Sequence, residues 1–112
     1  MVVVIQRMIQ KLYPGKWDEL NKINAKFDDI EAKYGFPQNK KRLRCLFGEV
    51  GANSIVIEFE WPSLSKMEKA MTKAYLDPEY QKLTEKLDSI IISATTEIYT
   101  PVITFEDLQT EG

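Results

Sequence analysis

The chain has 112 residues, of which 44% are hydrophobic and 29% charged, and its formal net charge is -2. These values are typical of one soluble globular domain, and they give no overall attraction to nucleic acid or to an anionic membrane. No stretch is apolar for long enough to span a membrane, and MVVVIQRM at the start lacks the charged region and cleavage site of a secretory signal.

The sequence contains no histidine and a single cysteine, Cys45. These counts exclude Ser-His-Asp and Cys-His nucleophile systems, as well as zinc or haem iron held by histidines of this chain. They also exclude an internal disulfide and a cysteine-rich metal site, and a lone thiol fits a reducing cytosol. We therefore expect a cytoplasmic protein that binds no metal and carries no cofactor.

The first third of the chain predicts a strand and a helix. Val2–Met8 is rich in β-branched residues and predicts a strand, which Tyr13-Pro14-Gly15 ends. Apolar residues then recur every three or four positions over residues 17–34, which predicts an amphipathic helix. Gly35 can take the left-handed closing position, and Pro37 prevents the helix from resuming.

The next two segments, Lys41–Gly48 and Ser54–Trp61, alternate apolar and polar residues and predict a hairpin. If this hairpin centres on Gly51, arginines of the first strand lie opposite glutamates of the second, as favourable cross-strand pairs. The predicted pairs are Arg44–Glu58 and Arg42–Glu60. The apolar face would contain Leu43, Cys45, Phe47, Ile55, Ile57, Phe59 and Trp61. A slip of one residue would exchange the two faces, so this register predicts one apolar and one charged face.

Two helices are predicted after the hairpin. Ser63 is a natural N-cap for the first, with a capping box from Ser65 to Glu68 as the alternative. In the stretch LDPEYQKL, Asp77 can end this helix and cap a new one that starts at Pro78, because proline disfavours helical dihedrals in the residue before it. We interpret LDPEYQKL as a capping device and not as a functional motif.

Ile90–Val102 predicts the last strand, with its polar face formed by Ser93, Thr95, Glu97 and Tyr99. The predicted order is therefore β-α-β-β-α-α-β. This order is typical of a ferredoxin-like α+β sandwich, in which helices pack on the apolar face of an antiparallel sheet. We expect a single domain over residues 1–102, followed by a loosely held C-terminal tail over residues 103–112.

The charged face of the predicted sheet has two possible environments. A monomer could leave it in contact with water, as antiparallel sheets often do. Alternatively, two such sheets could pack face to face across a two-fold axis and form a barrel, which would make the protein a homodimer.

Three stretches carry a resemblance to a known superfamily: YPGKWDEL, IVIEFEWPSLSKMEKAM and LDPEYQKL. Over roughly residues 2–102 the chain resembles the dimeric α+β barrel superfamily, most of all its NIPSNAP-like branch; antibiotic-biosynthesis-type monooxygenases and muconolactone isomerases share that fold. The resemblance implies the barrel and the homodimer, but little about chemistry, because these stretches are structural. For the monooxygenases, the resemblance implies a set of functional residues made of Asn and Trp, or of Tyr, Arg and Trp. Haem-degrading members add a histidine, which this chain lacks.

The charged face supplies the candidate ligand-binding residues. They are Arg7, Arg42, Arg44, Glu58 and Glu60. An arginine among them could hold a carboxylate or an enolate. The parity of the first strand leaves Gln6 as an alternative to Arg7, and we favour Arg7. A structural lattice of ion pairs is the simpler interpretation of the set, because the predicted register pairs the charges.

Glu97 and Tyr99 are the candidate catalytic residues. A partly desolvated Glu97 could act as a general base, and Tyr99 could orient a phenol or an enol. Ordinary lining of a surface is the simpler role for both. Trp17 and Trp61 are expected in the core or in an interface rather than in a substrate stack, and Cys45 in the core.

The basic stretch NKKRLR raises the question of RNA binding, because RNA-recognition domains share this order of elements. Those domains need basic and aromatic residues on their third strand, whereas SIVIEFEW places Glu58 and Glu60 there. We therefore expect no nucleic-acid partner. The functional expectation is a NIPSNAP-like homodimer that binds a small organic ligand on its polar sheet face. A cofactor-independent monooxygenase or isomerase and a non-catalytic assembly module are the alternatives.

Overall fold

The computed structural model describes residues 3–102. Its elements are β1 (Val4–Leu12), α1 (Trp17–Lys33), β2 (Lys41–Arg44), β3 (Ser54–Trp61), α2 (Leu64–Tyr75), α3 (Pro78–Asp88) and β4 (Ile91–Tyr99). The predicted order is confirmed. The predicted C-terminal tail, residues 103–112, lies outside the described residues.

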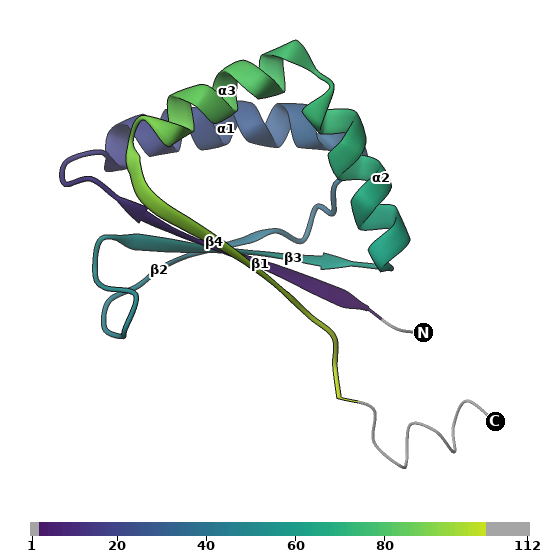
Figure 1. Cartoon of the computed structure of the whole chain (residues 1–112), viewed down its shortest axis with the longest axis horizontal. Coiled ribbons are helices and arrows are strands. Elements are labelled where there is room, and N and C mark those ends of the chain that lie inside the picture. Colours follow the sequence, from purple (N-terminus) through teal and green to yellow (C-terminus); the bar gives the residue numbers. More distant parts are fainter. Residues whose placement is uncertain (1–2, 103–112) are drawn as a thin grey trace.

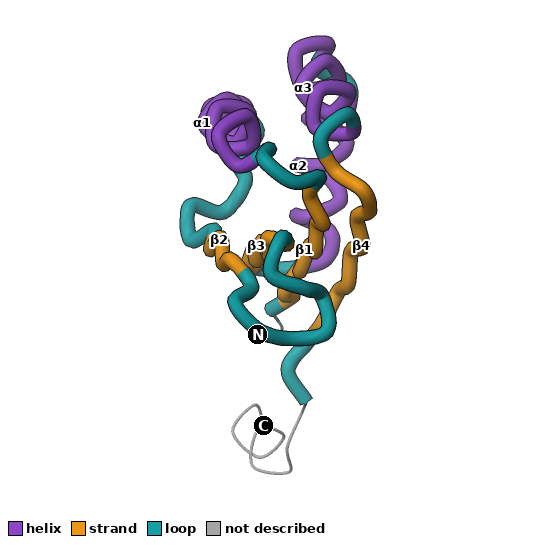
Figure 2. Tube along the Cα trace, turned by 90° about the vertical axis from the view of Figure 1, so that its left-hand side faces the viewer, coloured by secondary structure: helices purple, strands orange, loops and turns teal. Residues whose placement is uncertain are grey.

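The strands form one antiparallel sheet in the order β2-β3-β1-β4. The helices lie on one face of this sheet, whereas the β2–β3 loop and the described stretch after β4 descend on the other side (Figures 1 and 2). We call this second face the open face. The arrangement is the predicted ferredoxin-like α+β sandwich.

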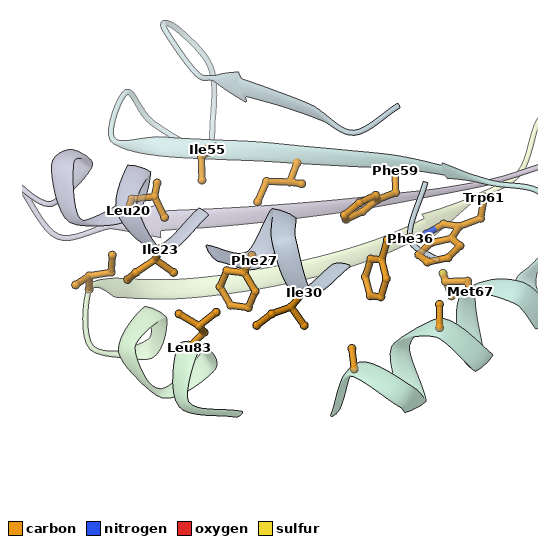
Figure 3. Close-up of a cluster of buried hydrophobic side chains, with 14 of the residues drawn as sticks. Leu20, Ile23, Phe27, Ile30, Phe36, Ile55, Phe59, Trp61, Met67 and Leu83 are labelled. Atoms are coloured by element: carbon orange, nitrogen blue, oxygen red, sulfur yellow. The ribbon is translucent and has the colours of Figure 1, made fainter. Parts of the chain in front are cut away.

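The hydrophobic core lies between the helices and the sheet. Leu20, Ile23, Phe27 and Ile30 recur at helical spacing along α1 and lie in the layer between α1, α3 and the sheet (Figure 3). The ring of Phe36 lies edge-on to the rings of Phe59 and Trp61, at centroid distances of 5.6 and 5.2 Å. Burying each large apolar side chain contributes about 1.5–3 kcal/mol, so this layer stabilises the fold and fixes which face of the sheet is open.

The helix termini form as the local sequence predicts. The hydroxyl of Ser63 accepts a hydrogen bond from the backbone N–H of Lys66, so Ser63 is the N-cap of α2. The carboxylate of Asp77 accepts from the backbone N–H of Glu79 at 2.8 Å, with Pro78 as the first residue of α3. The interpretation of LDPEYQKL as a helix stop and restart is confirmed.

The parity of β1 is settled by its pairing with both neighbours. Gln6 lies opposite Phe59 on the helix side of the sheet, whereas Arg7 lies opposite Glu58 and Glu97 on the open face. The prediction that favoured Arg7 over Gln6 is confirmed. The strand is also longer than predicted, because it continues to Leu12 before the turn at Tyr13.

The predicted register of the hairpin is wrong. Lys41 lies opposite Glu58, and Arg44 lies opposite Ile55, so the pairing is shifted by an odd number of residues and both faces of β2 are exchanged. Leu43, which was expected in the core, is 51% exposed. Cys45 lies beyond the end of β2, partly exposed, with its thiol 3.3 Å from the carbonyl oxygen of Phe47.

The arginines of β2 point to the helices, and their contacts explain the exchanged faces. Arg42 donates to both carboxylate oxygens of Asp28 on α1, at 2.7 and 3.0 Å. The guanidinium of Arg44 lies over the ring of Trp17, 4.3 Å from its centroid. A short edge strand can therefore direct charged residues to the helix side when the first helix offers partners for them.

Candidate functional site

A row of alternating charges crosses the whole open face. Lys41 on β2 lies opposite Glu58 on β3, Glu58 lies opposite Arg7 on β1, and Arg7 lies opposite Glu97 on β4. We call these four residues the charge ladder. Their signs run plus, minus, plus, minus from one edge of the sheet to the other, and their formal charges cancel.

Arg7 is the centre of this site. Its guanidinium lies 3.3 Å from Oε2 of Glu58, and it lies over the ring of Tyr99 with 5.1 Å to the centroid. Both members of the Arg7–Glu58 ion pair are partly exposed. An exposed ion pair of this kind contributes about 0–1 kcal/mol to folding. The pairing of the strands therefore positions these side chains, and the ion pair itself adds little to the stability of the sheet.

Tyr99 and Glu97 lie on the same face of β4, as predicted. A hydrogen bond to the carboxylate of Glu97 raises the pKa of Tyr99, partial burial raises it further, and the charge of Arg7 opposes the increase. The phenol therefore stays protonated at neutral pH and can donate a hydrogen bond. It is not suited to act as a base.

An apolar row lies directly beside the charge ladder. It consists of Leu43, Val56 and Ile9, which lie opposite one another across β2, β3 and β1, and the polar Thr95 continues it on β4. On the other side of the ladder lie Glu60, Ile5 and Tyr99. The open face therefore carries an apolar row beside the charge ladder, whereas the sequence predicted a charged and polar face.

The structure brings together Arg7, Glu58, Glu97 and Tyr99 and places the exposed Glu60 nearby on the same face. It does not bring Arg42 and Arg44 there, and the predicted pairs Arg44–Glu58 and Arg42–Glu60 are wrong. Lys41 takes the place that Arg44 was expected to occupy opposite Glu58. The basic stretch NKKRLR indicated a cation at this position, but only the register identifies which one.

A second polar cluster lies on the helix side, at the end of α1. Lys40 forms ion pairs with Glu31 at 2.9 Å and with Asp28 at 3.4 Å, and it lies over the ring of Phe59. Burial raises the pKa of Glu31, which the charge of Lys40 opposes. Arg42 and Lys40 together lower the pKa of Asp28, although its own desolvation opposes them.

This helix-side cluster lines a cavity of about 230 Å³ together with Pro37 and Gln38. Two carboxylates and two cations face one another there, so the charges are matched within the cluster. We interpret it as the structural lattice of ion pairs that the sequence placed on the opposite face.

Residues 3–102 were compared with the requirements of a metal site and of a membrane-spanning helix. In that range, no three metal-ligating side chains of His, Cys, Asp or Glu come together as a metal site would need. The helices of the same range are too short or too polar for a membrane span.

No family model matches the sequence, and no curated protein matches it. Solved structures do match. An uncharacterised NIPSNAP domain protein from Burkholderia xenovorans is 17% identical with a TM-score of 0.74, and the match covers 88% of this chain and 94% of that one. A NIPSNAP family protein from Agrobacterium tumefaciens is 18% identical with a TM-score of 0.70, covering 89% and 93%.

A third match is SnoaB, a cofactor-independent oxygenase from Streptomyces nogalater. It is 14% identical with a TM-score of 0.68, and the match covers 92% of this chain and 96% of that chain. Identities this low establish the fold and leave the chemistry open. The chain therefore has the α+β fold of the NIPSNAP domain proteins and of the cofactor-independent oxygenase SnoaB.

Proposed function

We propose that this protein is a cytoplasmic homodimer that binds a small organic molecule between two open faces. One observation carries the proposal: the open face of the sheet holds a continuous apolar row beside a centred group of polar side chains. Leu43 is half exposed there, and Ile9 and Val56 remain partly exposed. Apolar side chains gathered on an uncovered sheet face are typical of an interaction surface.

The polar centre indicates what the ligand would be. Arg7 supplies a cation beside an aromatic ring, and the protonated phenol of Tyr99 supplies a donor. Glu58 and Glu97 already balance the charge of Arg7, which disfavours a strongly anionic ligand. A planar aromatic or enolisable molecule with one acceptor oxygen fits these groups best.

Native mass spectrometry of the freshly purified protein tests this proposal. The expected result is a dimer that carries additional mass from a bound small molecule. Tyr99→Ala should release that mass, because it removes the ring and the phenol donor. Tyr13→Ala is the matched control, since Tyr13 is an exposed tyrosine outside the open face. A wild-type monomer, or a dimer without added mass, would refute the proposal.

A catalytic version is favoured by the placement of Glu97 and Tyr99 on the same face of β4 beside Arg7, and by the likeness to SnoaB. In this version Glu97 takes a proton from an aromatic methylene or a phenol, Arg7 stabilises the anion that forms, and Tyr99 orients it. Molecular oxygen would then add to this carbon as a hydroperoxide, which loses water to leave a carbonyl group. Both hydrogens of the methylene leave in the water, and the substrate itself is the reductant of the oxygen. Isomerisation of an enolisable substrate would need the same proton transfer.

Oxygen uptake with an aromatic methylene ketone as the probe separates the catalytic version from binding alone. Glu97→Gln should abolish oxygen uptake while the variant still binds the probe, because the amide keeps the shape but cannot accept the proton. If oxygen uptake were equal in the wild type and in Glu97→Gln, the catalytic role of Glu97 would be wrong. If the wild type bound the probe without consuming oxygen, binding alone would stand.

A further inference from the structure

We propose that the charge ladder fixes how the two copies meet: Arg7 lies over the partner's Glu58, and Lys41 lies over the partner's Glu97. This inference rests on the proposed homodimer and adds its geometry. The two-fold axis runs parallel to the strands, midway between β3 and β1. Each Arg7 thereby gains a carboxylate from the facing sheet in addition to Glu58 and Glu97 of its own sheet.

The order of signs on the ladder leads to this arrangement. A two-fold axis through the middle of the row reverses the row on the facing sheet. A row that reads plus, minus, plus, minus reads minus, plus, minus, plus after reversal, so each charge meets an opposite one. Neighbouring strands are about 4.8 Å apart and packed sheets about 10 Å, distances that facing Arg and Glu side chains can bridge.

Other two-fold axes match the charges less well. An axis that lies in the interface but runs across the strands would place each residue of the ladder over its own copy, so every contact would join like charges. An axis along β1 would place Arg7 over the partner's Arg7. An axis between β1 and β4 would match only Arg7 with the partner's Glu97 and leave half of each sheet uncovered.

The apolar row independently supports the same axis. Under this symmetry each row faces its own copy, so Val56 lies over the partner's Ile9 and Leu43 over the partner's Thr95. The axis that matches the charges therefore also packs Val56 on the partner's Ile9, at the centre of the interface. Sheets that pack face to face cross at about 30°, which displaces the outer pairs more than the central Arg7–Glu58 pairs.

Charges in such an interface act mainly on specificity. Opposite charges that leave water gain little net affinity, whereas like charges placed face to face weaken association strongly. The ladder would therefore select one register and one orientation from the several that the apolar row alone permits.

Complementary charge reversals test the arrangement. In Arg7→Glu, two pairs of facing glutamates replace two attractive pairs, and Glu58→Arg produces the same conflict between arginines. Each variant alone should dimerise roughly 100-fold more weakly than the wild type in analytical ultracentrifugation. An equimolar mixture of the two should restore a heterodimer, because the Glu at position 7 then faces the Arg at position 58 of the other chain.

Lys11→Glu is the matched control. Lys11 is exposed on the same face of β1, but the proposed symmetry places it at the partner's Ser54, which is fully buried within its own protomer. No charge faces Lys11 there, so its reversal should leave dimerisation unchanged. Circular dichroism melting shows that each variant is folded. If the wild type were monomeric, the proposed function itself would fail. If the wild type dimerised but the mixture gave no preference for the heterodimer in native mass spectrometry, only the proposed arrangement would fail.

Discussion

Gln6 shows how this small core accommodates a polar side chain. Gln6 is 2% exposed, and its side-chain amide oxygen accepts a hydrogen bond from the indole N–H of Trp61 at 3.0 Å. Its amide nitrogen lies 3.5 Å from the sulfur of Met71, which is a weak acceptor. A buried polar group costs little while it is paired and much more when its partner is removed.

Trp61→Phe removes the donor and leaves the oxygen of Gln6 buried without a partner. We expect a loss of about 1–3 kcal/mol in the free energy of unfolding, measured by urea denaturation. Gln6→Leu combined with Trp61→Phe should lose less than the single Trp61→Phe variant, because no polar atom is then left unpaired. Equal losses in the single and double variants would show that packing of the indole, and not the hydrogen bond, is the cause.

At the scale of elements, Asp77 links the start of α3 to the end of α1. Its carboxylate caps α3 and also accepts a hydrogen bond from the hydroxyl of Tyr34. The hydrogen bond from Tyr34 lowers the pKa of Asp77, as does the backbone N–H of Glu79. The same interaction raises the pKa of Tyr34, because deprotonation would place two negative charges side by side.

These shifts predict the pH range in which this link stabilises the fold. A lowered pKa means that the contribution of Asp77 is complete above its ordinary value of 3.8 and is lost as the pH falls through the lower folded value. A raised pKa means that Tyr34 contributes below its ordinary value of 10.0 and ceases to do so as the pH rises through the higher folded value.

Asp77→Asn tests this range, because asparagine can still cap α3 but cannot titrate. The difference in melting temperature between wild type and variant should be largest near neutral pH and should shrink in acid. In a Tyr34→Phe background the difference should be smaller at every pH. A difference that stayed constant from neutral pH down to about pH 2.5 would contradict the assignment.

The helices and caps could be predicted from the sequence because their signals are local. Ser63, Asp77 and Pro78 each act within one turn of chain. The register of β2 could not be predicted in this way, because it depends on Asp28 and Trp17, which lie on the first helix. For the same reason Arg7, Glu58, Glu97 and Tyr99 could be placed on one face by parity, whereas Lys41 could not.

At the scale of the molecule, the helices cover one face of the sheet and leave the other open, where we propose that a second copy binds. Val56→Glu should therefore disrupt the dimer without unfolding the protomer, because the new carboxylate would enter the apolar row of the facing sheet. We expect a shift to monomer in light scattering, with an unchanged far-ultraviolet spectrum.

The control for Val56→Glu makes a similar change on the other side of the molecule. Leu76 is 74% exposed at the end of α2, so Leu76→Glu adds the same charge away from the open face. This variant should remain dimeric. Dissociation by both variants would indicate that net charge, and not the open face, governs association.

The exposure of β4 has a consequence for the lifetime of the protein. This edge strand reads IISATTEIY, carries one formal charge, and leaves Ile92 and Ile98 about half exposed. Long edge strands with few charges are templates for uncontrolled pairing with other chains. Ile98 lies opposite Gln6 on the helix side of the sheet, so this edge stays uncovered in the proposed dimer as well. Aggregation through β4 should therefore limit storage of the wild type and of dissociated variants alike.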